Sequence, residues 1–340
     1  MNITFRQLRL FLALAETGSV SAAARMVHVT QPTASMGLKE ITDAVGVPLY
    51  EVVARKVHLT AMGQELAKTA RAISTEWESF EQEVHGVKGL TQGKLKVAVV
   101  STAKYFVPRI LGTFCAKYPQ IDISLEVLNR DGVVQRLEEN LDDLYIMSQP
   151  PLHLDIDDEV FMPNPLLLIA SKEHFLAKKK IVDLTSLKNE KFIFREKGSG
   201  TRMATDAHFK RLKLKPNIRL ELGSNEAIKQ AVIGGLGVAV LSKYSLGDKS
   251  DQEVAILKCK EFPIKSSWHI VSPKGKKLSP IATIFFGDSF FIAYVIMNQL
   301  EIRLAQLTDR ALIRSISERT WPSTYGHIIS QEQIDFMLNW

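Results

Sequence analysis

Residues 18–38 read Gly-Ser-Val-Ser-Ala-Ala-Ala-Arg-Met-Val-His-Val-Thr-Gln-Pro-Thr-Ala-Ser-Met-Gly-Leu. The small side chains of Ala22–Ala24 predict a short helix that packs closely against its neighbours. Thr30 can cap a second helix, in which Pro32 falls in the first turn, where a missing N–H removes no hydrogen bond. Two short helices joined by a tight turn are typical of a helix-turn-helix, whose second helix enters the major groove of DNA.

The flanking residues extend this pair of helices into a small domain. Upstream, Thr4-Phe-Arg-Gln7 has the spacing of a capping box, and apolar residues recur behind it at helical period until Gly18. Downstream, the second helix is expected to end at Gly46, and two short apolar stretches then enclose Arg55-Lys56, as in a wing with cations at its tip. We therefore expect a winged helix-turn-helix domain over residues 1–60.

Such a domain would contact DNA from its second helix and its wing. The Gln31 amide can pair with an adenine edge in the major groove, whereas nearby hydroxyls can donate to phosphates. The alternatives are that Thr30 and Pro32 only cap the helix, and that Gln31 and Arg55 are solvated. The residues that we assign to DNA contact are Thr30, Gln31, Pro32, Thr33, Ser35, Met36, Lys39, Arg55 and Lys56.

Residues 61–90 carry apolar side chains at alternating spacings of four and three. These residues are Leu66, Ala70, Ile73, Trp77, Phe80, Val84 and Val87. The spacing is the a/d pattern of a coiled coil. A single helix with this stripe has no local surface to cover it, so we expect a linker helix that pairs with a second copy. The alternative is a long helix that packs on its own domain.

From residue 91 to residue 297, short strands alternate with helices. Strands are expected over 94–100, 121–128, 144–147, 166–170, 191–194, 218–222 and 238–241, and helices over 105–118, 132–139, 202–212 and 225–233. This alternation is typical of βαβ units and a parallel sheet. The break at Ser148-Gln-Pro-Pro151 suggests two lobes, with the chain returning to the first lobe late. The fold class is therefore α/β, with a two-lobed domain like that of periplasmic binding proteins.

Two loops of this domain share an unusual feature. Ser101–Lys104 and Arg195–Arg202 each follow a strand and open a helix with hydroxyls, and each places a cation near the first turn, where it opposes the helix dipole. A bound anion would reverse this penalty, so we expect the lobes to close on a phosphorylated or carboxylated metabolite. The alternative is that the hydroxyls only cap and the cations are solvated. The residues assigned to this site are Ser101, Thr102, Lys104, Asn129, Gln149, Arg195, Ser199, Thr201 and Arg202.

Taken together, these motifs resemble those of the LysR-type transcriptional regulators. The matching blocks are Phe5–Phe11, Gly18–Ala24, Thr30–Thr33, Gly46–Tyr50 and Val57–Thr60 with Gly63. Ser101–Phe106, Asn140–Leu144 and Gln149–Pro151 are similar to the subgroup that regulates Rubisco (Calvin-cycle) operons. The resemblance implies a linker coiled coil, a two-lobed effector domain, usually a homotetramer, and a response to metabolites such as sugar phosphates or NADPH. A regulator of another metabolic operon is the alternative within the family.

Composition excludes several classes of protein. With 46% hydrophobic and 24% charged residues, the chain has the composition of an ordinary globular protein. Cys115 and Cys259 are too few for a disulfide framework or a four-ligand zinc site, which favours a reducing compartment. The most apolar stretch, 281–297, is interrupted and short for a bilayer span, and no secretion signal is recognised. We therefore expect a cytoplasmic protein without a membrane segment.

Double-stranded promoter DNA and a second copy of the chain, in a homodimer or homotetramer, are the expected partners, and RNA polymerase is a further candidate. The net charge of +6 permits DNA binding without requiring it. The histidines show no metal-ligand spacing, so a small-molecule effector is expected and no cofactor or metal. An enzyme that binds phosphate at residues 198–202 is opposed by the lack of a nucleophile motif, and a solute-binding protein by residues 1–88.

Residues 298–340 form an atypical C-terminal tail. Lysine is absent from residue 278 onward, although it is frequent before that point, and the tail has no counterpart in the family resemblance. A shifted reading frame and an unrelated extension are both compatible with this composition. No fold is predicted for the tail.

Overall fold

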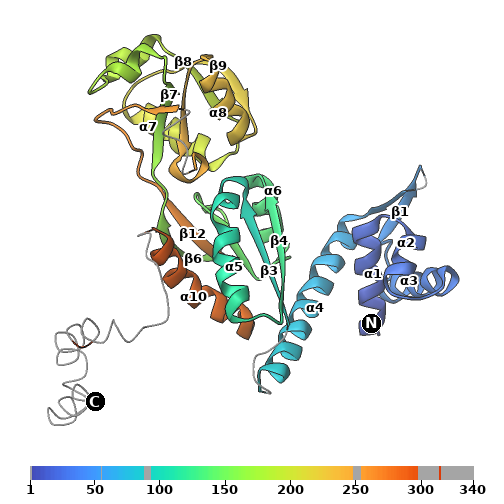
Figure 1. The fold of residues 1–340 in the computed structure, drawn as a ribbon. Coiled ribbons are helices and arrows are strands. Elements are labelled where there is room, and N and C mark those ends of the chain that lie inside the picture. The colour runs from blue at the N-terminus through green and yellow to red at the C-terminus, as the bar shows by residue number, and fades with distance from the viewer. Residues whose placement is uncertain (1, 55, 88–92, 248–253, 298–313, 315–340) are drawn as a thin grey trace. The chain divides into compact units, whose positions relative to one another are not determined.

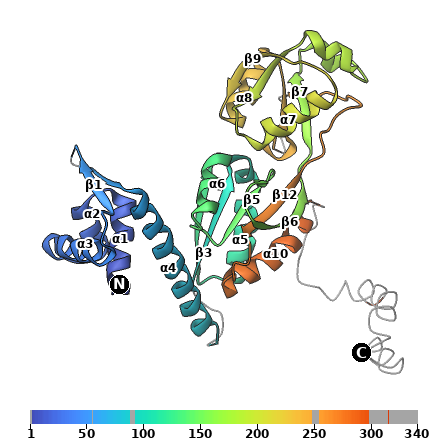
Figure 2. The same ribbon diagram turned by 180° about the vertical axis from the view of Figure 1, so that it is seen from behind.

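The chain is described by a computed structural model (Figures 1 and 2). The residues that the structure describes are 2–54, 56–87, 93–247, 254–297 and 314. Residues 1–293 form one compact unit. The prediction for the tail therefore lies almost entirely outside the described residues.

Three helices and a hairpin form the N-terminal domain: α1 (Phe5–Thr17), α2 (Val20–Met26), α3 (Gln31–Val45), β1 (Tyr50–Val53) and β2 (Lys56–Leu59). The predicted end signals are confirmed. Thr4 makes the capping box with Gln7, and the Thr30 hydroxyl accepts from the Thr33 amide. Gly18 and Gly46 end α1 and α3 with φ of +61° and +82°, a left-handed conformation that glycine adopts without strain.

The core of this domain lies between the three helices. Phe11, Leu14, Leu38 and Ile41 are fully buried there. The predicted wing is the antiparallel pair of β1 and β2, in which Val53 lies opposite Lys56. A single long helix, α4 (Ala61–Val87), follows the wing.

Two five-stranded sheets make up the rest of the unit. Lobe I has the strand order β4 (Ile121–Leu128), β3 (Gly93–Val100), β5 (Leu144–Met147), β12 (Ser267–Pro273), β6 (Ile156–Pro163). Lobe II has the order β11 (Val254–Ile256), β7 (Leu166–Ser171), β10 (Val238–Ser242), β8 (Lys191–Arg195), β9 (Asn217–Leu222). All seven predicted strands are present. The chain crosses between the lobes after β6 rather than at residues 148–151, and it returns to lobe I with β12, as expected.

The sheets are mixed, and the expectation of a parallel sheet is therefore wrong in part. In lobe I, β3 is parallel to β4 and β5, but β12 is antiparallel to β5 and β6. In lobe II, β8 is parallel to β9 and β10, whereas β7 is antiparallel to β10 and β11. The physical reason is the crossing between lobes: a strand that leaves or re-enters a lobe arrives from the opposite direction and pairs accordingly.

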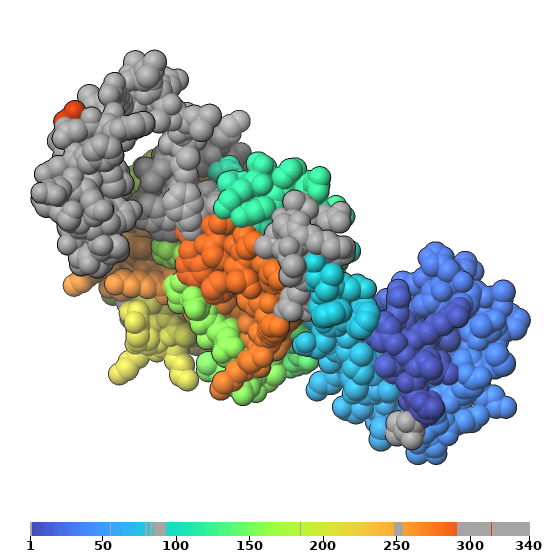
Figure 3. All heavy atoms as spheres, turned by 90° about the horizontal axis from the view of Figure 1, so that it is seen from below, coloured from blue at the N-terminus to red at the C-terminus, as the bar shows by residue number. Residues whose placement is uncertain are grey.

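Helices cover both faces of the lobe I sheet. They are η1 (Ser101–Tyr105), α5 (Val107–Lys117), α6 (Arg130–Glu138) and α10 (Pro280–Met297). The connections from β3 to β4 and from β4 to β5 run in opposite directions along the sheet, so right-handed crossovers place α5 and α6 on opposite faces. Phe114 of α5 packs edge-on against Phe285 of α10, and the space-filling view shows the two helices in contact (Figure 3).

Lobe II carries the shorter connections. Its helices are η2 (Phe175–Lys178), η3 (Leu184–Asn189), α7 (Gly200–Arg211), α8 (Asn225–Ile233) and η4 (Lys243–Ser245). Both α7 and α8 begin directly after strands, β8 and β9, whose carboxyl ends lie at the same sheet edge. Ligands in open α/β sheets bind outside this edge, so the topology directs attention to the loops that follow β3, β8 and β9.

Candidate functional site

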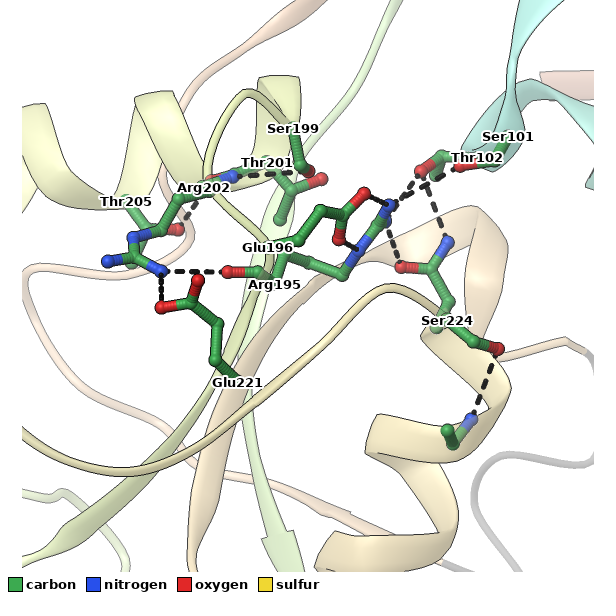
Figure 4. Close-up of polar contacts among 12 residues, drawn as sticks. Ser101, Thr102, Arg195, Glu196, Ser199, Thr201, Arg202, Thr205, Glu221 and Ser224 are labelled. Carbon is green, nitrogen blue, oxygen red and sulfur yellow. Dashed lines mark hydrogen bonds and ion pairs between the residues drawn. The ribbon is translucent and has the colours of Figure 1, made fainter. Parts of the chain in front are cut away.

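Arg195, the last residue of β8, is the centre of a polar cluster between the lobes (Figure 4). Its side chain is almost completely buried, and each of the five guanidinium N–H groups has an acceptor. Nε and one N–H of Nη2 donate to the Glu196 carboxylate at 2.7 and 2.8 Å. The remaining groups donate to Asn225 Oδ1 and, at 3.4 Å each, to the hydroxyls of Ser101 and Thr102. In the two carboxylate contacts the donor and the acceptor are both charged, so Glu196 neutralises the buried guanidinium.

Asn225 and Thr102 complete the bridge between the lobes. Both side chains are buried, and Asn225 Nδ2 donates to the Thr102 hydroxyl at 3.1 Å. A second bridge joins Tyr105 of η1 to Glu226 of α8, with the phenol donating to the carboxylate at 2.8 Å. Burial, together with this hydrogen bond, raises the pKa of Tyr105 above its ordinary value, so the phenol stays protonated as the donor.

The start of α7 lies against lobe I. A Cβ on Gly200 would come within 2.8 Å of the Ser148 hydroxyl, and one on Gly198 within 2.7 Å of the Asp131 carboxylate. The Ser199 hydroxyl caps α7 by accepting from the Arg202 amide, and Thr201 is buried in the first turn. A side chain at either position would have to displace these groups, and Gly198 also has a φ of +87°, so glycine fits this close approach of lobe II to lobe I.

Arg202 faces away from this cluster, which corrects the reasoning that selected it. Its guanidinium donates at 2.8 Å to the Glu221 carboxylate and to the Arg195 carbonyl (Figure 4). It also donates at 2.8 Å to the Asp206 carboxylate. It also stacks 4.8 Å from the centre of the Phe194 ring. The pKa of Glu221 is held below its ordinary value by this contact. The cation therefore has counter-charges of its own and needs no ligand to offset the helix dipole.

This geometry predicts a structural role for Arg202. Replacing it by glutamine should lower the free energy of unfolding by about 2 kcal/mol, because the Arg195 carbonyl loses a charged hydrogen-bond donor and the Phe194 ring loses the guanidinium that stacks on it. The surface-pair variant Lys274→Gln, whose partner Asp155 is solvated, should leave the free energy of unfolding nearly unchanged. Urea unfolding followed by circular dichroism measures both changes; equal effects would contradict the structural role.

The structure places most of the other predicted effector residues in or around the polar cluster, and places Lys104 outside it. Asn129 caps α6 by accepting from the Gly132 amide at 2.9 Å, and Gln149 follows β5 at the same sheet edge. Lys104 is exposed, with its ammonium 5.2 Å from the centre of the Tyr105 ring. The cluster thus contains Ser101, Thr102 and Arg195, with Ser199, Thr201, Asn129 and Gln149 around it, whereas Lys104 lies outside it.

Sequence reasoning missed two residues of this region, Asn225 and Arg130. Asn225 is the first residue of α8, which Ser224 caps by accepting from the Ala227 amide. Arg130 follows β4 directly after Asn129, and its Nε donates to the Gln149 carbonyl at 2.8 Å. The position after a strand, which selected Asn129, could have selected Arg130 by the same reasoning.

The predicted DNA-contacting residues of α3 lie mainly on its outer face. Gln31, Pro32, Thr33, Met36 and Lys39 are exposed, as is Thr30 before them. Ser35 is half-buried, and its hydroxyl accepts from the Gln31 amide at 2.9 Å. Lys56 is exposed at the start of β2, and Arg55 lies outside the described residues. The opposite face of α3 packs into the core, so only the exposed face of the helix is available to contact DNA.

The apolar stripe of α4 divides into two parts. Leu66 packs against the core of the N-terminal domain and Ala70 is fully buried, so the expectation that Ala70 contacts a partner helix is corrected by its burial within the chain. Ile73, Trp77, Phe80 and Val84 are each exposed by 42–54%. The Trp77 ring lies 5.7 Å from those of Phe5 and Phe80, and the Val87 side chain lies outside the description. The exposed part alone offers a surface for pairing.

Among the described residues, none of the helices combines the length and apolar character that a bilayer span requires. Within the same part of the chain, His, Cys, Asp and Glu side chains nowhere gather in a group of three that could hold a metal ion.

Two regions of the chain match known protein families. Residues 5–64 match the family model described as "Bacterial regulatory helix-turn-helix protein, lysR family", and residues 88–287 match the "LysR substrate binding domain". The HTH-type transcriptional activator CmpR of Synechocystis is 44% identical over 290 residues, which are 85% of this chain and 95% of that protein. The RuBisCO operon transcriptional regulator of Acidithiobacillus ferrooxidans is 40% identical over 290 residues, with coverages of 85% and 94%.

One solved structure is similar in both sequence and fold. The regulatory domain of Synechocystis CcmR, solved in complex with 2-PG, is 47% identical and has a TM-score of 0.56. The match covers 61% of this chain and 99% of that domain.

Proposed function

The chain belongs to the LysR family of transcriptional regulators, and on that premise we propose that it controls carbon-fixation genes in response to a phosphorylated anion bound between its lobes. The gene class is supported by the names of its relatives, which include a regulator of a RuBisCO operon. The ligand class is supported by the complex of the CcmR domain with 2-PG, 2-phosphoglycolate. Because such a regulator acts on promoter DNA, its place of action is the cytoplasm.

The observation that carries the ligand proposal is the buried guanidinium of Arg195. A buried cation is stable only beside an anion, and here Glu196 supplies one from the adjacent position in the chain. A phosphate placed against Arg195 would accept hydrogen bonds from the guanidinium N–H groups. The hydroxyls of Ser101 and Thr102 would donate to the same phosphate from lobe I. Binding would thus strengthen contacts that reach both lobes.

The remaining effector residues take supporting roles in this proposal. Ser199 and Thr201 would donate hydroxyls from the first turn of α7, and Asn129 and Gln149 would line the lobe I side. Lys104 and Arg202 are excluded from ligand contact, because one is exposed outside the cluster and the other is held by Glu221 and Asp206.

Ligand binding and DNA binding are linked through the assembly. We assign pairing of two copies to the exposed part of the α4 stripe, with a homotetramer as the full assembly. The α3 helices of the two copies would then contact two half-sites of an interrupted palindrome. A ligand that favours one arrangement of the lobes shifts the population of assemblies and changes how the pair meets the promoter.

The ligand proposal is tested by calorimetric titration of the intact protein with 2-phosphoglycolate, a sugar phosphate, NADPH and unphosphorylated glycolate. We expect saturable binding of at least one phosphorylated compound and none of glycolate. At about 100 times its dissociation constant, the ligand should stabilise the protein by about 2.7 kcal/mol in thermal unfolding. If none of the phosphorylated compounds gives a signal, the effector proposal is rejected.

Two substitutions in the N-terminal domain separate base recognition from phosphate contact. Gln31→Ala should reduce discrimination between the operator and a sequence changed at one position by about 1–3 kcal/mol. Lys56→Ala should weaken binding to both sequences alike and reduce the slope of log K against log salt by about one. Fluorescence anisotropy at several salt concentrations measures both quantities. The same response to both substitutions would contradict the assigned roles.

A further inference from the structure

Arg130 carries a half-buried guanidinium in lobe I that contacts none of the carboxylates among the described residues. Its Nε donates to the Gln149 carbonyl at 2.8 Å, and in the described part of the chain Nη1 and Nη2 have no protein acceptor. Burial lowers the pKa of Arg130, and the adjacent Asp131 offsets this effect only in part. Arg136, Arg195 and Arg202 are also largely buried, and each contacts at least one carboxylate at 2.7–2.8 Å.

The sheet topology places this guanidinium beside the polar cluster. The parallel strands β4, β3 and β5 are neighbours in that order, so their carboxyl ends share one edge. Arg130 follows β4, yet it bonds to Gln149, which follows β5, so its side chain spans the end of β3. Ser101 directly follows β3, and the Arg195 guanidinium of lobe II donates to its hydroxyl. Neighbouring strands are about 4.8 Å apart, so the two guanidiniums approach the same space from opposite lobes.

We propose that Arg130 binds the second anionic group of a metabolite whose phosphate is held by Arg195. The inference rests on the proposed function and adds the residue that would select a ligand with two anionic groups, a phosphate and a carboxylate separated by a few bonds, over a ligand with a phosphate alone. Each guanidinium presents planar N–H pairs that match a carboxylate or a phosphate. A ligand with both groups would join lobe I to lobe II through two ion pairs, and one with a phosphate alone would keep only the contact to Arg195.

A pair of ligands isolates this second contact. 2-Phosphoglycolate and ethyl phosphate have the same phosphate ester and differ in that a methyl group replaces the carboxylate. We expect Arg130→Gln, in the intact protein, to weaken 2-phosphoglycolate binding about 10- to 100-fold and to change ethyl phosphate binding less than about threefold. Arg219→Gln is the matched control, because Arg219 also donates to a backbone carbonyl, that of Leu236, but is exposed. This control should change neither dissociation constant.

Calorimetry with both ligands distinguishes failure of this inference from failure of the proposed function. If the unaltered protein binds 2-phosphoglycolate and Arg130→Gln binds it equally well, the inference is wrong and the proposed function stands. An equal loss for both ligands overturns the inference too, because it indicates a general disturbance of the site. If the unaltered protein binds neither ligand, the inference is rejected, and the proposed function is rejected as well only if the sugar phosphate and NADPH also give no signal.

A second variant covers the case in which Arg130→Gln does not fold, as judged by its circular dichroism and thermal unfolding. Arg130→Lys retains the positive charge and loses the planar pair of donors. Its preference for 2-phosphoglycolate over ethyl phosphate should fall below that of the unaltered protein but stay above one. A preference equal to that of the unaltered protein would contradict a bidentate contact by Arg130.

Discussion

Arg195→Gln is expected to weaken 2-phosphoglycolate binding by more than about 100-fold. The substitution removes the buried cation that contacts hydroxyls of lobe I from lobe II, and with it the charged donor that we assign to the ligand phosphate. Truncating one member of a buried, hydrogen-bonded charge pair costs about 2–5 kcal/mol, and 2.7 kcal/mol corresponds to about 100-fold. Calorimetric titration of the intact protein measures the change, with circular dichroism as the check on folding.

Lys104→Gln is the informative comparison for this prediction. Lys104 and Arg195 come from loops that the sequence selected for the same reason, but Lys104 is exposed outside the polar cluster. We expect its substitution to change the dissociation constant less than about threefold, because the charge of an exposed side chain outside the cluster is screened by solvent and salt. A loss for Lys104→Gln as large as for Arg195→Gln would mean that the ligand binds elsewhere.

Phe80→Glu is expected to dissociate the pair of chains. Phe80 is the most exposed large side chain of the α4 stripe, and in the dimer it would face the equivalent helix of the second copy. Burying a carboxylate in an apolar seam without a partner costs several kcal/mol, so the dimer dissociation constant should rise at least about 100-fold. Sedimentation velocity over a range of protein concentrations measures this change, and affinity for a two-half-site operator should fall with it.

Lys68→Glu is the matched control on the same helix. Lys68 is exposed and lies in the heptad on the side away from the stripe. Lys68→Glu introduces the same carboxylate and also reverses a charge, but it does so outside the stripe. It should therefore leave the sedimentation coefficient unchanged. If Phe80→Glu remains a dimer at the concentrations at which the unaltered protein is one, the stripe does not form the interface.

The N-terminal domain could be predicted almost completely because its signals are local. Thr4, Gly18, Thr30 and Gly46 each mark a helix end within a few residues, and each functions as the sequence indicates. The seven strands were predictable for the same reason, since a short run of Val, Ile and Leu between helical patterns identifies a buried strand. These elements need no knowledge of distant partners.

Strand pairing and the partners of charged groups could not be predicted in this way. The partners of β12 lie more than a hundred residues upstream, and the direction of pairing depends on where the chain crosses between the lobes. Likewise, Arg202 has its own carboxylates and Arg130 has none, although both sit near the start of a helix. The two arginines are told apart only when Glu221, on β9, and Gln149, after β5, are placed in space.

The stripe on α4 illustrates the same limit. The spacing predicts one continuous apolar face, and Ala70 fits it as well as Phe80 does. In the folded chain Ala70 is fully buried, whereas Phe80 is exposed. Periodicity therefore identifies the face, and the contacts of the folded chain determine how much of it remains for a partner.

DNase I footprinting on the intergenic DNA beside the regulated operon tests the central claim most directly. With and without 2-phosphoglycolate, at low salt, the protein should protect two half-sites of an interrupted palindrome, and the ligand should change the extent or spacing of the protected region. A monomeric protein that leaves this DNA unprotected, or a footprint unaffected by every phosphorylated ligand, would contradict the account.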